Sequence, residues 1–467
     1  MKSMQSNILV LALLGIGLVI LHALTSQLSH QFIFGQGHKQ RPIITFIVLM
    51  GSAGVLYIIA LEWMYRHAVI FSDPKVLMFI CLTALMMRLV YSSSNFIQET
   101  DPYRYIWDGQ AMIQGVNPYQ HAPQEAMQNN FRPVSNDAAA QDVYRKINHE
   151  GVKTIYPPLA QSLFALSQWL TPWKIIGWKW TVTLADCVIM GLLITIFGRI
   201  SLPKAWVIVY AWSPLVIKEF SNSVHLDVFA LLMLSLMIYA LVRGWQVLAY
   251  ISLAGAVLIK LFAIVLLPLL ICWRFKDQKR YLLQNLLIFF SILILSYLPF
   301  LNAGVFLTEG LGRFLSEWQT NEGIFGLIRW AVSLLPMGEG LQNLSSRLVS
   351  ACLFSIGLAG ILFWLRKENS IHSLMKAMAV SLAMLFFLLP TGNPWYYTWV
   401  ILFIPFLPLR ALILFSVLVF GYYLDFYFTY HQSRPMFVFV QWVEYGLFFL
   451  VLGGELWRQR LPLLSRS

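Results

Sequence analysis

Charged residues are scarce in this sequence. Of its 467 residues only 12% are Asp, Glu, Lys or Arg, whereas 58% are hydrophobic, and the mean hydropathy is +0.68. Ordinary soluble domains carry about 25% charged residues. The composition therefore excludes an ordinary soluble domain and predicts a polytopic membrane protein.

Long basic runs are also missing, although the net charge is +12. Membrane proteins collect Lys and Arg in their cytoplasmic loops, which accounts for the charge without a nucleic-acid partner. Cysteine is rare as well: Cys81, Cys187, Cys272 and Cys352 all lie in apolar runs without CxxC spacing. We expect no disulfide, no metal site and no required cofactor.

Apolar runs, in contrast, are frequent. They predict an all-α bundle of about 13–14 transmembrane helices. The predicted spans are 8–28, 43–63, 76–94, 178–198, 205–221, 225–242, 246–258, 261–273, 282–300, 346–365, 374–390, 396–409, 411–428 and 436–456. The first has no clear cleavage site and is expected to be a retained signal anchor.

Two of these runs, 246–258 and 261–273, are each too short to cross a bilayer squarely. Read as one span, they would place the most basic loop, around residues 274–280, outside the cell. Since basic loops face the cytoplasm, we expect a helical hairpin with Lys260 near its outer turn. Both termini then lie in the cytoplasm. Four segments share the outer face: a large loop at 95–176 with short surface helices and an interfacial helix at 154–170, and the segments 221–227, 302–330 and 391–397.

The start of the large loop is polar, with the sequence ETDPYRYIWDGQAMIQGVNPY at 99–119. Asp101 is our candidate general base, with Glu99 as a substitute, because two close carboxylates raise one another's pKa. Asp101 before Pro102 is equally typical of a helix N-cap. Arg104 and Asp108, four residues apart, form either an intrahelical ion pair or part of the site.

Several other residues could serve the same site. His225-x-Asp227 begins a predicted span and either caps it, contacts a ligand or, less well supported, binds a metal. Lys260 is flanked by hydrocarbon and is expected either to snorkel to the headgroups or to contact a phosphate. Arg313 and Arg329 are alternatives for that contact. Arg88 and Asp186, both inside predicted spans, are expected to pair or to line the cavity.

The blocks DPYRYIWDGQAMIQGVNPYQHAP, SVHLD, VLIKLFAIVLLPLL, NEGIF and GNPWYYTW follow in order. Together they resemble the GT-C class of integral-membrane glycosyltransferases, in particular the bacterial polyprenol-phosphate-mannose-dependent mannosyltransferase-like proteins, over about residues 85–410. The resemblance implies an inverting transfer of a hexose, with mannose expected, from a polyprenyl phosphate to a lipid or glycan hydroxyl, at the outer face of a bacterial inner membrane.

The resemblance assigns the base to Asp101 and places Lys260 near the donor phosphate, although the Tyr-Pro that follows this Lys in the family is replaced here. Asn393 stands where many relatives have His. The residues expected to contact substrate are Glu99, Arg104, Tyr105, Asp108, Asn117, Tyr119, Tyr156, His225, Asp227, Lys260, Arg313, Glu322, Arg329, Asn393 and Trp395.

The sequence predicts two extra N-terminal spans (1–70), a catalytic module (71–430), and a last span with a cytoplasmic tail (431–467). Two other classes stay open. A transporter or flippase of lipid-linked sugars would show broken helices and related halves, and we find no internal repeat. A ligase or polymerase would use diphosphate-linked oligosaccharides. The sequence leaves the oligomeric state open.

Overall fold

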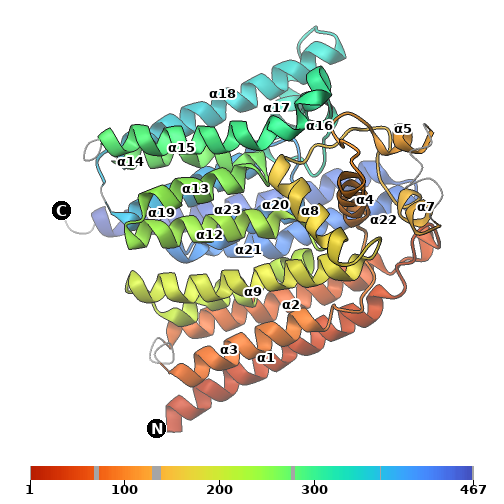
Figure 1. Cartoon of the computed structure of the whole chain (residues 1–467). Coiled ribbons are helices and arrows are strands. Elements are labelled where there is room, and N and C mark those ends of the chain that lie inside the picture. Colours follow the sequence, from red (N-terminus) through yellow and green to blue (C-terminus); the bar gives the residue numbers. More distant parts are fainter. Residues whose placement is uncertain (1, 68–72, 129–137, 275–278, 369, 465–467) are drawn as a thin grey trace. The chain divides into compact units, whose positions relative to one another are not determined.

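The computed structural model describes residues 2–67, 73–128, 138–274, 279–368 and 370–464 (Figure 1). These residues form helices and one isolated parallel bridge, between Thr320 and Thr391. Eight helices in the described part are long and apolar enough to cross a membrane. They are Ser6–Ser29, His38–Arg66, Ile175–Arg199, Tyr281–Glu317, Glu339–Leu365, Ile371–Leu388, Arg410–Tyr430 and Arg434–Arg458. The chain is thus a multi-pass helical membrane protein.

Other predicted spans correspond to shorter or broken helices, so the predicted number of 13–14 spans stays a prediction. The run 205–221 divides into η3 (Lys204–Val207), α10 (Ile208–Ala211), α11 (Pro214–Ile217) and the π-helical η4 (Lys218–Asn222). Pro214 lacks a backbone N–H and starts a new helix. Hydrophobicity marks such a run but does not fix its helix lengths.

The chain divides into two compact units, and each is discontinuous in sequence. Unit 1 comprises Met1–Gln98, Phe197–Glu219 and Gln319–Ser467, and unit 2 comprises Glu99–Ile196 and Phe220–Trp318. The three consecutive domains predicted from the sequence stay a prediction.

Unit 1 is built mainly from long helices. In it α1 packs on α2 and α3, α18 on α19, and α21 on α23. Besides the short helices named above, its elements are α1 (Lys2–Ser29), η1 (His38–Gln40), α2 (Ile43–Arg66), α3 (Pro74–Leu89), α17 (Ile324–Ser333), α18 (Glu339–Leu365), α19 (Ile371–Leu388), α20 (Pro394–Phe403), η7 (Ile404–Phe406), α21 (Arg410–Leu418), η8 (Val419–Tyr423), α22 (Leu424–Tyr430), η9 (Arg434–Met436) and α23 (Phe437–Leu464).

Unit 2 combines apolar helices with the polar loop. In it α12 packs on α13, α13 on α15, and α4 on α8. Its elements are α4 (Asp101–Ile113), α5 (Pro123–Gln128), α7 (Ala138–Tyr144), α8 (Pro158–Leu170), α9 (Ile175–Arg199, whose last residues belong to unit 1), α12 (Asp227–Arg243), α13 (Gln246–Val257), η5 (Leu261–Leu266), α14 (Leu267–Arg274), α15 (Lys279–Tyr297), η6 (Leu298–Thr308) and α16 (Glu309–Glu317).

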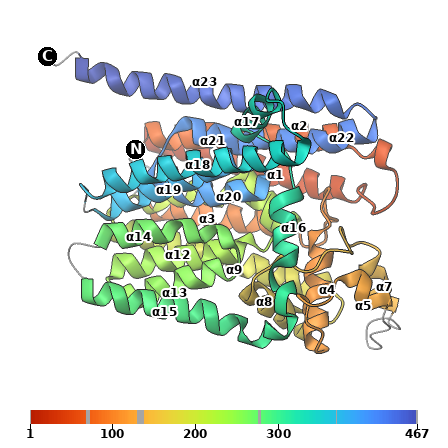
Figure 2. The same ribbon diagram turned by 90° about the horizontal axis from the view of Figure 1, so that it is seen from above.

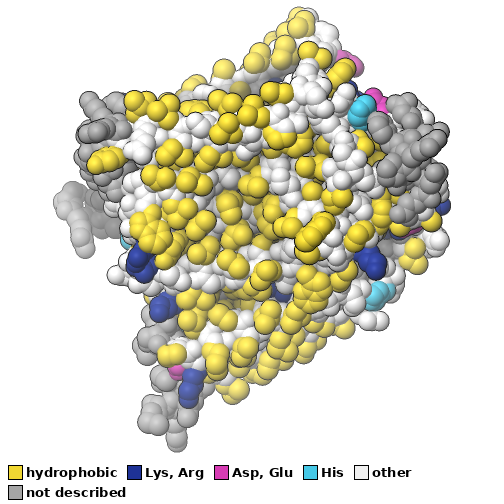
Figure 3. Space-filling model, in the orientation of Figure 1, with side chains coloured by type: hydrophobic (Ala, Val, Ile, Leu, Met, Phe, Trp, Pro, Cys, Tyr) yellow, Lys and Arg dark blue, Asp and Glu magenta, His cyan; other side chains and the backbone are white. Residues whose placement is uncertain are grey.

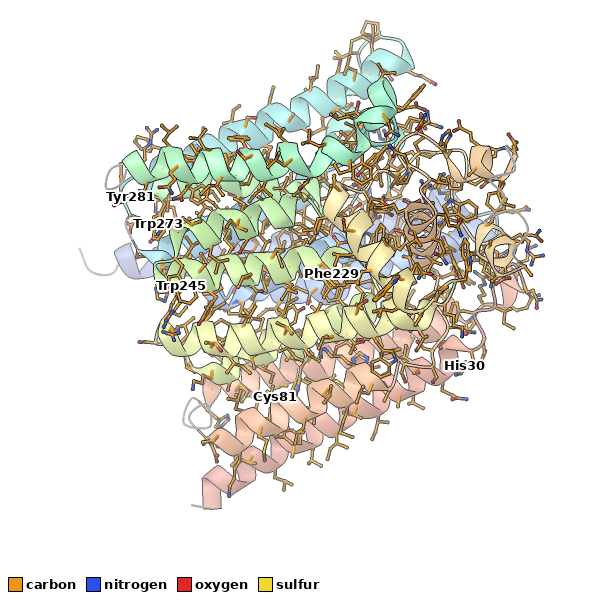
Figure 4. All side chains as sticks on the ribbon, in the orientation of Figure 1. His30, Cys81, Phe229, Trp245, Trp273 and Tyr281 are labelled. Carbon is orange, nitrogen blue, oxygen red and sulfur yellow. The ribbon has the colours of Figure 1, made fainter. Side chains whose placement is uncertain are left out.

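The predicted helical hairpin is present in unit 2. α13 ends at Val257, and Lys260 adopts an extended conformation (φ −145°, ψ 116°) before η5 begins. Figure 4 shows Trp245, before α13, and Trp273, in α14, at the same end of the unit 2 helices, opposite Phe229 at the start of α12. The chain therefore reverses at 258–260 and places Lys260 at the turn.

The predicted interfacial helix corresponds to α8, which has 13 residues. Its first turn is fixed to the hairpin, because the amides of Leu159 and Ala160 donate to the carbonyl of Leu258 at 3.1 and 3.2 Å. α4 crosses α8 at very close range, since a Cβ on Gly109 would meet the carbonyl of Phe164. A glycine is required at that crossing.

Apolar side chains dominate the surface of the unit 2 helices, as the yellow atoms over α15 show in Figure 3. Leu283, Leu287 and Ile294 are 60–64% exposed there, a pattern that suits contact with lipid. At the end of α15 the chain bends at Gly304 (φ 55°), and α16 then runs across the end of that helix (Figure 2).

Candidate functional site

The N-terminus of α4 is held by Glu99. Its Oε1 accepts hydrogen bonds from the amides of Thr100 at 2.8 Å and Asp101 at 2.9 Å. The alternative in which Asp101 caps this helix is wrong, because the helix begins at Asp101 itself and has no side-chain cap on Thr100. Glu99 therefore takes up the amides of Thr100 and Asp101, two donors at the helix start that have no intrahelical partner.

Two pairs of ionisable side chains lie beside Asp101. The second oxygen of Glu99, Oε2, is 3.0 Å from Nε2 of His225. The ammonium of Lys260 donates to Oδ2 of Asp227 at 3.1 Å. Glu99, His225 and Asp227 are almost fully buried, while the Lys260 side chain keeps 14% of its surface exposed. The start of α4, the start of α12 and the hairpin turn thus bring their charges together.

Backbone strain accompanies the first pair. Gln98, immediately before Glu99, has φ 54°, and Val224, immediately before His225, has φ 49°. A positive φ is unfavourable for a β-branched residue such as Val224, whose carbonyl accepts a hydrogen bond from Nε1 of Trp178 at 2.8 Å. Such strain persists only where surrounding contacts impose it.

The carboxylate of Asp101 is partly exposed and accepts no hydrogen bond from any residue that the structure describes. Burial and the adjacent charge of Glu99 raise the pKa of Asp101 to about 7, while His225 and Lys260 oppose this rise and Asp227 adds to it. A carboxylate with that pKa is suited to accept a proton near neutral pH.

Tyr105 follows Asp101 by four residues and lies on the same face of α4. Its ring stacks on Phe164 at 4.7 Å between centroids, with Tyr156 and Trp178 edge-on at 5.3 and 5.5 Å. The Tyr105 hydroxyl is buried and has no hydrogen-bond partner among the described residues. Burial and the nearby carboxylates hold the pKa of Tyr105 well above its usual range, so it is a hydrogen-bond donor.

Arg104 and Asp108 form the predicted intrahelical ion pair, at 2.7 Å, with both side chains at least 90% buried. Arg104 also donates to the carbonyl of Val152 at 2.8 Å. The other oxygen of Asp108 accepts from Nε2 of Gln161 at 3.1 Å, and Gln161 in turn donates to Thr154 at 2.7 Å. This network ties α4 to the loop before α8 and to α8 itself.

A cavity of about 250 Å³ lies next to these elements. Tyr156 connects it to the aromatic cluster around Tyr105, and Leu261 connects it to the hairpin turn at Lys260. Its lining is mostly apolar and aromatic: Tyr119, Thr154, Ile155, Tyr156, Pro157, Leu261, Tyr297, Leu307, Thr308 and Leu311. A mostly apolar lining with a few hydroxyl groups is typical of a ligand pocket.

The segment η6–α16 closes one side of this cavity and is fixed to the loop before α8. Lys153 forms an ion pair with Glu309 at 2.8 Å and lies 3.5 Å from the centroid of Phe306. A Cβ on Gly310 would meet the carbonyl of Lys153. This contact could not be predicted, since Lys153 is an ordinary loop residue in the linear chain.

Asn117 and Tyr119 form a turn. Oδ1 of Asn117 accepts from the amide of Tyr119 at 3.0 Å, and its Nδ2 donates to Asn302 at 2.5 Å. The hydroxyl of Tyr119 donates to the carbonyl of Tyr156 at 2.7 Å. These contacts shape the cavity wall.

Arg313 is also in unit 2, on α16. It pairs with Glu317 at 3.3 Å, and both side chains are about half exposed. The pair is therefore a surface ion pair of α16, and its predicted contact with a phosphate stays a prediction.

Four predicted substrate contacts belong to unit 1. Glu322 pairs with Arg329 at 2.8 Å, and burial raises the pKa of Glu322. Oδ1 of Asn393 accepts from Thr320 at 2.6 Å, and Trp395 packs edge-on against Tyr396. Their roles toward a substrate stay predictions.

Arg88 lies in unit 1 and Asp186 in unit 2. The guanidinium of Arg88 donates to the carbonyls of Ala84 and Ala211 at 3.0 and 2.8 Å. Asp186 is fully buried in α9. The predicted pairing of the two residues stays a prediction.

Some residues of the unit 2 site escaped prediction. Gln161, Thr154 and Trp178 hold the loop and the strained turn, but polar or aromatic residues at such positions carry no local signal of their partners. No group of three His, Cys, Asp or Glu side chains in the described part of the chain is placed to hold a metal ion. The sequence matches no protein-family model, and no curated protein is significantly similar to it.

Proposed function

We propose that the protein is an inverting hexosyltransferase of the GT-C type, which moves a sugar from a polyprenyl phosphate to an acceptor hydroxyl at one face of a membrane. Mannose is the expected sugar, and a bacterial inner membrane with the site on its outer face is the expected location. The observation that carries the proposal is Asp101, a carboxylate free to accept a proton, with a pKa of about 7, near the cation of Lys260. The same unit holds an apolar cavity that includes Leu261, the residue after Lys260.

In the proposed reaction Asp101 takes the proton of the acceptor hydroxyl as its oxygen attacks the anomeric carbon. The bond between that carbon and the phosphate oxygen breaks, and the polyprenyl phosphate leaves with the electron pair. Attack opposite to the leaving group inverts the anomeric configuration. General-base catalysis of this kind contributes about 10²–10⁴-fold to the rate.

Lys260 is our candidate for the group that stabilises the departing phosphate. Its side chain retains exposed surface at the hairpin turn although it pairs with Asp227, and a cation near developing negative charge lowers the barrier. The cavity that begins at Leu261 would take the apolar chain next to that phosphate. Glu99, His225 and Asp227 keep the two charged centres in place.

The test is a transfer assay with purified protein in proteoliposomes and a panel of polyprenyl-phosphate sugars, with released polyprenyl phosphate as the readout. We expect release that depends on the acceptor with at least one donor, loss of release in Asp101→Asn, and normal release in Asp142→Asn. Asp142 is a suitable control because it lies on α7 in the same loop, half exposed and paired with Lys146. Transport of donor without release would instead indicate a flippase.

A further inference from the structure

The segment that carries Glu99 and Asp101 and the segment that carries His225 and Asp227 each follow a point where the chain passes from unit 1 to unit 2. One crossing lies between Gln98 and Glu99, and another between Glu219 and Phe220. Glu99 and Asp101 follow the first crossing directly, and His225 and Asp227 follow the second within eight residues. Whatever fixes the last unit 1 residues therefore fixes where these segments start.

The first segment is anchored at Gln98. Its Oε1 accepts from Nη1 of Arg41 at 2.5 Å, and its Nε2 donates to the hydroxyl of Tyr430 at 2.9 Å. Arg41 also donates to that hydroxyl at 3.3 Å and to the carbonyl of Ile33 at 2.7 Å. Gln98 is 9% exposed and holds its strained φ of 54°, which requires contacts that over-determine its position.

The second segment is anchored at Lys218 and Glu219. These fully buried side chains pair at 3.3 Å. Both bond the hydroxyl of Tyr423: Lys218 contacts it closely, and it donates to Oε1 of Glu219 at 2.8 Å. The tyrosine ring itself is held edge-on against Phe46 at 5.1 Å. Lys218 begins the π-helical segment η4, a geometry that often marks functional positions.

Tyr423 and Tyr430 belong to one continuous stretch, the end of η8 and α22. They are seven residues apart, which places them on the same side of a helix two turns apart. We infer that Tyr423 and Tyr430 are positioning residues: this stretch holds the chain at Gln98 and at Lys218–Glu219, directly before the segments that carry Glu99 and Asp101 and, after a few more residues, His225 and Asp227. The kinetic part of this inference rests on the proposed function; the structural part does not.

Tyr427 provides a matched control. It lies between the two anchors on α22 and stacks on His431 at 4.3 Å, and its hydroxyl makes no hydrogen bond with any residue that the structure describes. Tyr→Phe at 423, 427 and 430 removes one oxygen atom each time and leaves the ring in place. Only the changes at 423 and 430 remove an anchor.

The first experiment is amide hydrogen exchange of the full-length protein in lipid nanodiscs. Tyr430→Phe is expected to speed exchange of the segment 99–105 by about tenfold, because a lost hydrogen bond lowers the free energy of local opening. Tyr423→Phe is expected to do the same for 220–228, and Tyr427→Phe to change neither. Unchanged exchange in 99–105 for a folded Tyr430→Phe protein would overturn the inference.

Tyr423→Phe removes one hydrogen-bond partner from a buried ion pair and is the variant most exposed to misfolding. Gln98→Ala is a second variant that keeps the inference testable. Gln98→Ala removes the first anchor from the other side. It should speed exchange of the segment 99–105 as Tyr430→Phe does, and the effect of the double variant should be less than the sum of the two, because both changes break the Gln98–Tyr430 bond. Additive effects would refute the shared anchor.

The second experiment is the transfer assay. Loss of an anchor should lower kcat about tenfold while the KM for the donor stays unchanged, since the cavity that would hold the lipid does not include these tyrosines. A rise in KM alone would contradict a positioning role. If the wild-type protein transfers no sugar, the proposed function fails while the exchange experiment still decides the anchors.

Discussion

The pH dependence of transfer tests the assignment of Asp101 most sharply. A base must be ionised to accept a proton, and the pKa of Asp101 is raised to about 7. The ionised fraction therefore grows about tenfold between pH 6 and pH 8, and kcat/KM should rise by the same factor, with an inflection near pH 7. An ordinary aspartate would be ionised throughout this range and give a flat profile.

Charge variants turn this profile into a test of the geometry. Lys260 lowers the pKa of Asp101 and Asp227 raises it. Lys260→Met should therefore move the inflection to higher pH and Asp227→Asn to lower pH, each by about one unit. Each change also leaves its former partner uncompensated, which acts in the same direction. The measurement is initial transfer rates in proteoliposomes between pH 5.5 and 9, after size-exclusion chromatography has shown each variant to be folded.

Asp101→Asn measures how much the general base contributes to the transfer rate. Loss of a general base costs about 10²–10⁴-fold in rate, or about 3–5 kcal/mol of barrier height. The residual activity should also lose its inflection near pH 7. A variant as active as the wild type, or an inflection that moves the same way in Lys260→Met and Asp227→Asn, would refute the role of Asp101.

Three further predictions concern stability and topology. Arg104→Ala should destabilise the protein by about 3 kcal/mol in denaturant unfolding monitored in detergent, because it leaves the buried carboxylate of Asp108 without its 2.7 Å partner; a loss below about 1 kcal/mol would show that solvent reaches this pair. Gly109→Ala should destabilise the protein by about 1–3 kcal/mol, because the added Cβ would meet the backbone of α8. Gly191 has open space around it, so Gly191→Ala should be neutral or should stabilise the protein by up to about 1 kcal/mol. Equal effects of the two changes on thermal unfolding would contradict this account. Reporter fusions in the basic loop 275–280, of which residues 275–278 lie outside the described residues, should locate to the cytoplasm. An external signal would invert the predicted topology.

Much of the architecture could be predicted from composition. Scarce charge and long apolar runs specify a multi-pass helical protein because a bilayer offers no partners for exposed backbone groups. The positive charge after residue 273 was enough to predict the hairpin at Lys260, which the structure has. The number of spans stays a prediction, because hydrophobicity cannot tell an unbroken helix from the broken segment at 204–222.

Some contacts of the polar loop could also be predicted from the sequence. The spacing of Arg104 and Asp108 predicts their ion pair, since residues four apart on a helix are neighbours. The same local reasoning left Asp101 undecided between a cap and a base. Only the fold shows that one oxygen of Glu99 bonds the amides at the start of α4 and that the other lies beside His225, more than 120 residues later.

The sequence by itself determined the membrane class, the hairpin and the short-range pairs, because each follows from solvent or from contacts within one helix. The tertiary structure alone decided which charges meet, because Glu99 with His225 and Asp227 with Lys260 join segments far apart in the chain. It also decided the strain at Gln98 and Val224 and the pKa of Asp101. These depend on burial and on neighbouring charges, which exist only once the chain has packed.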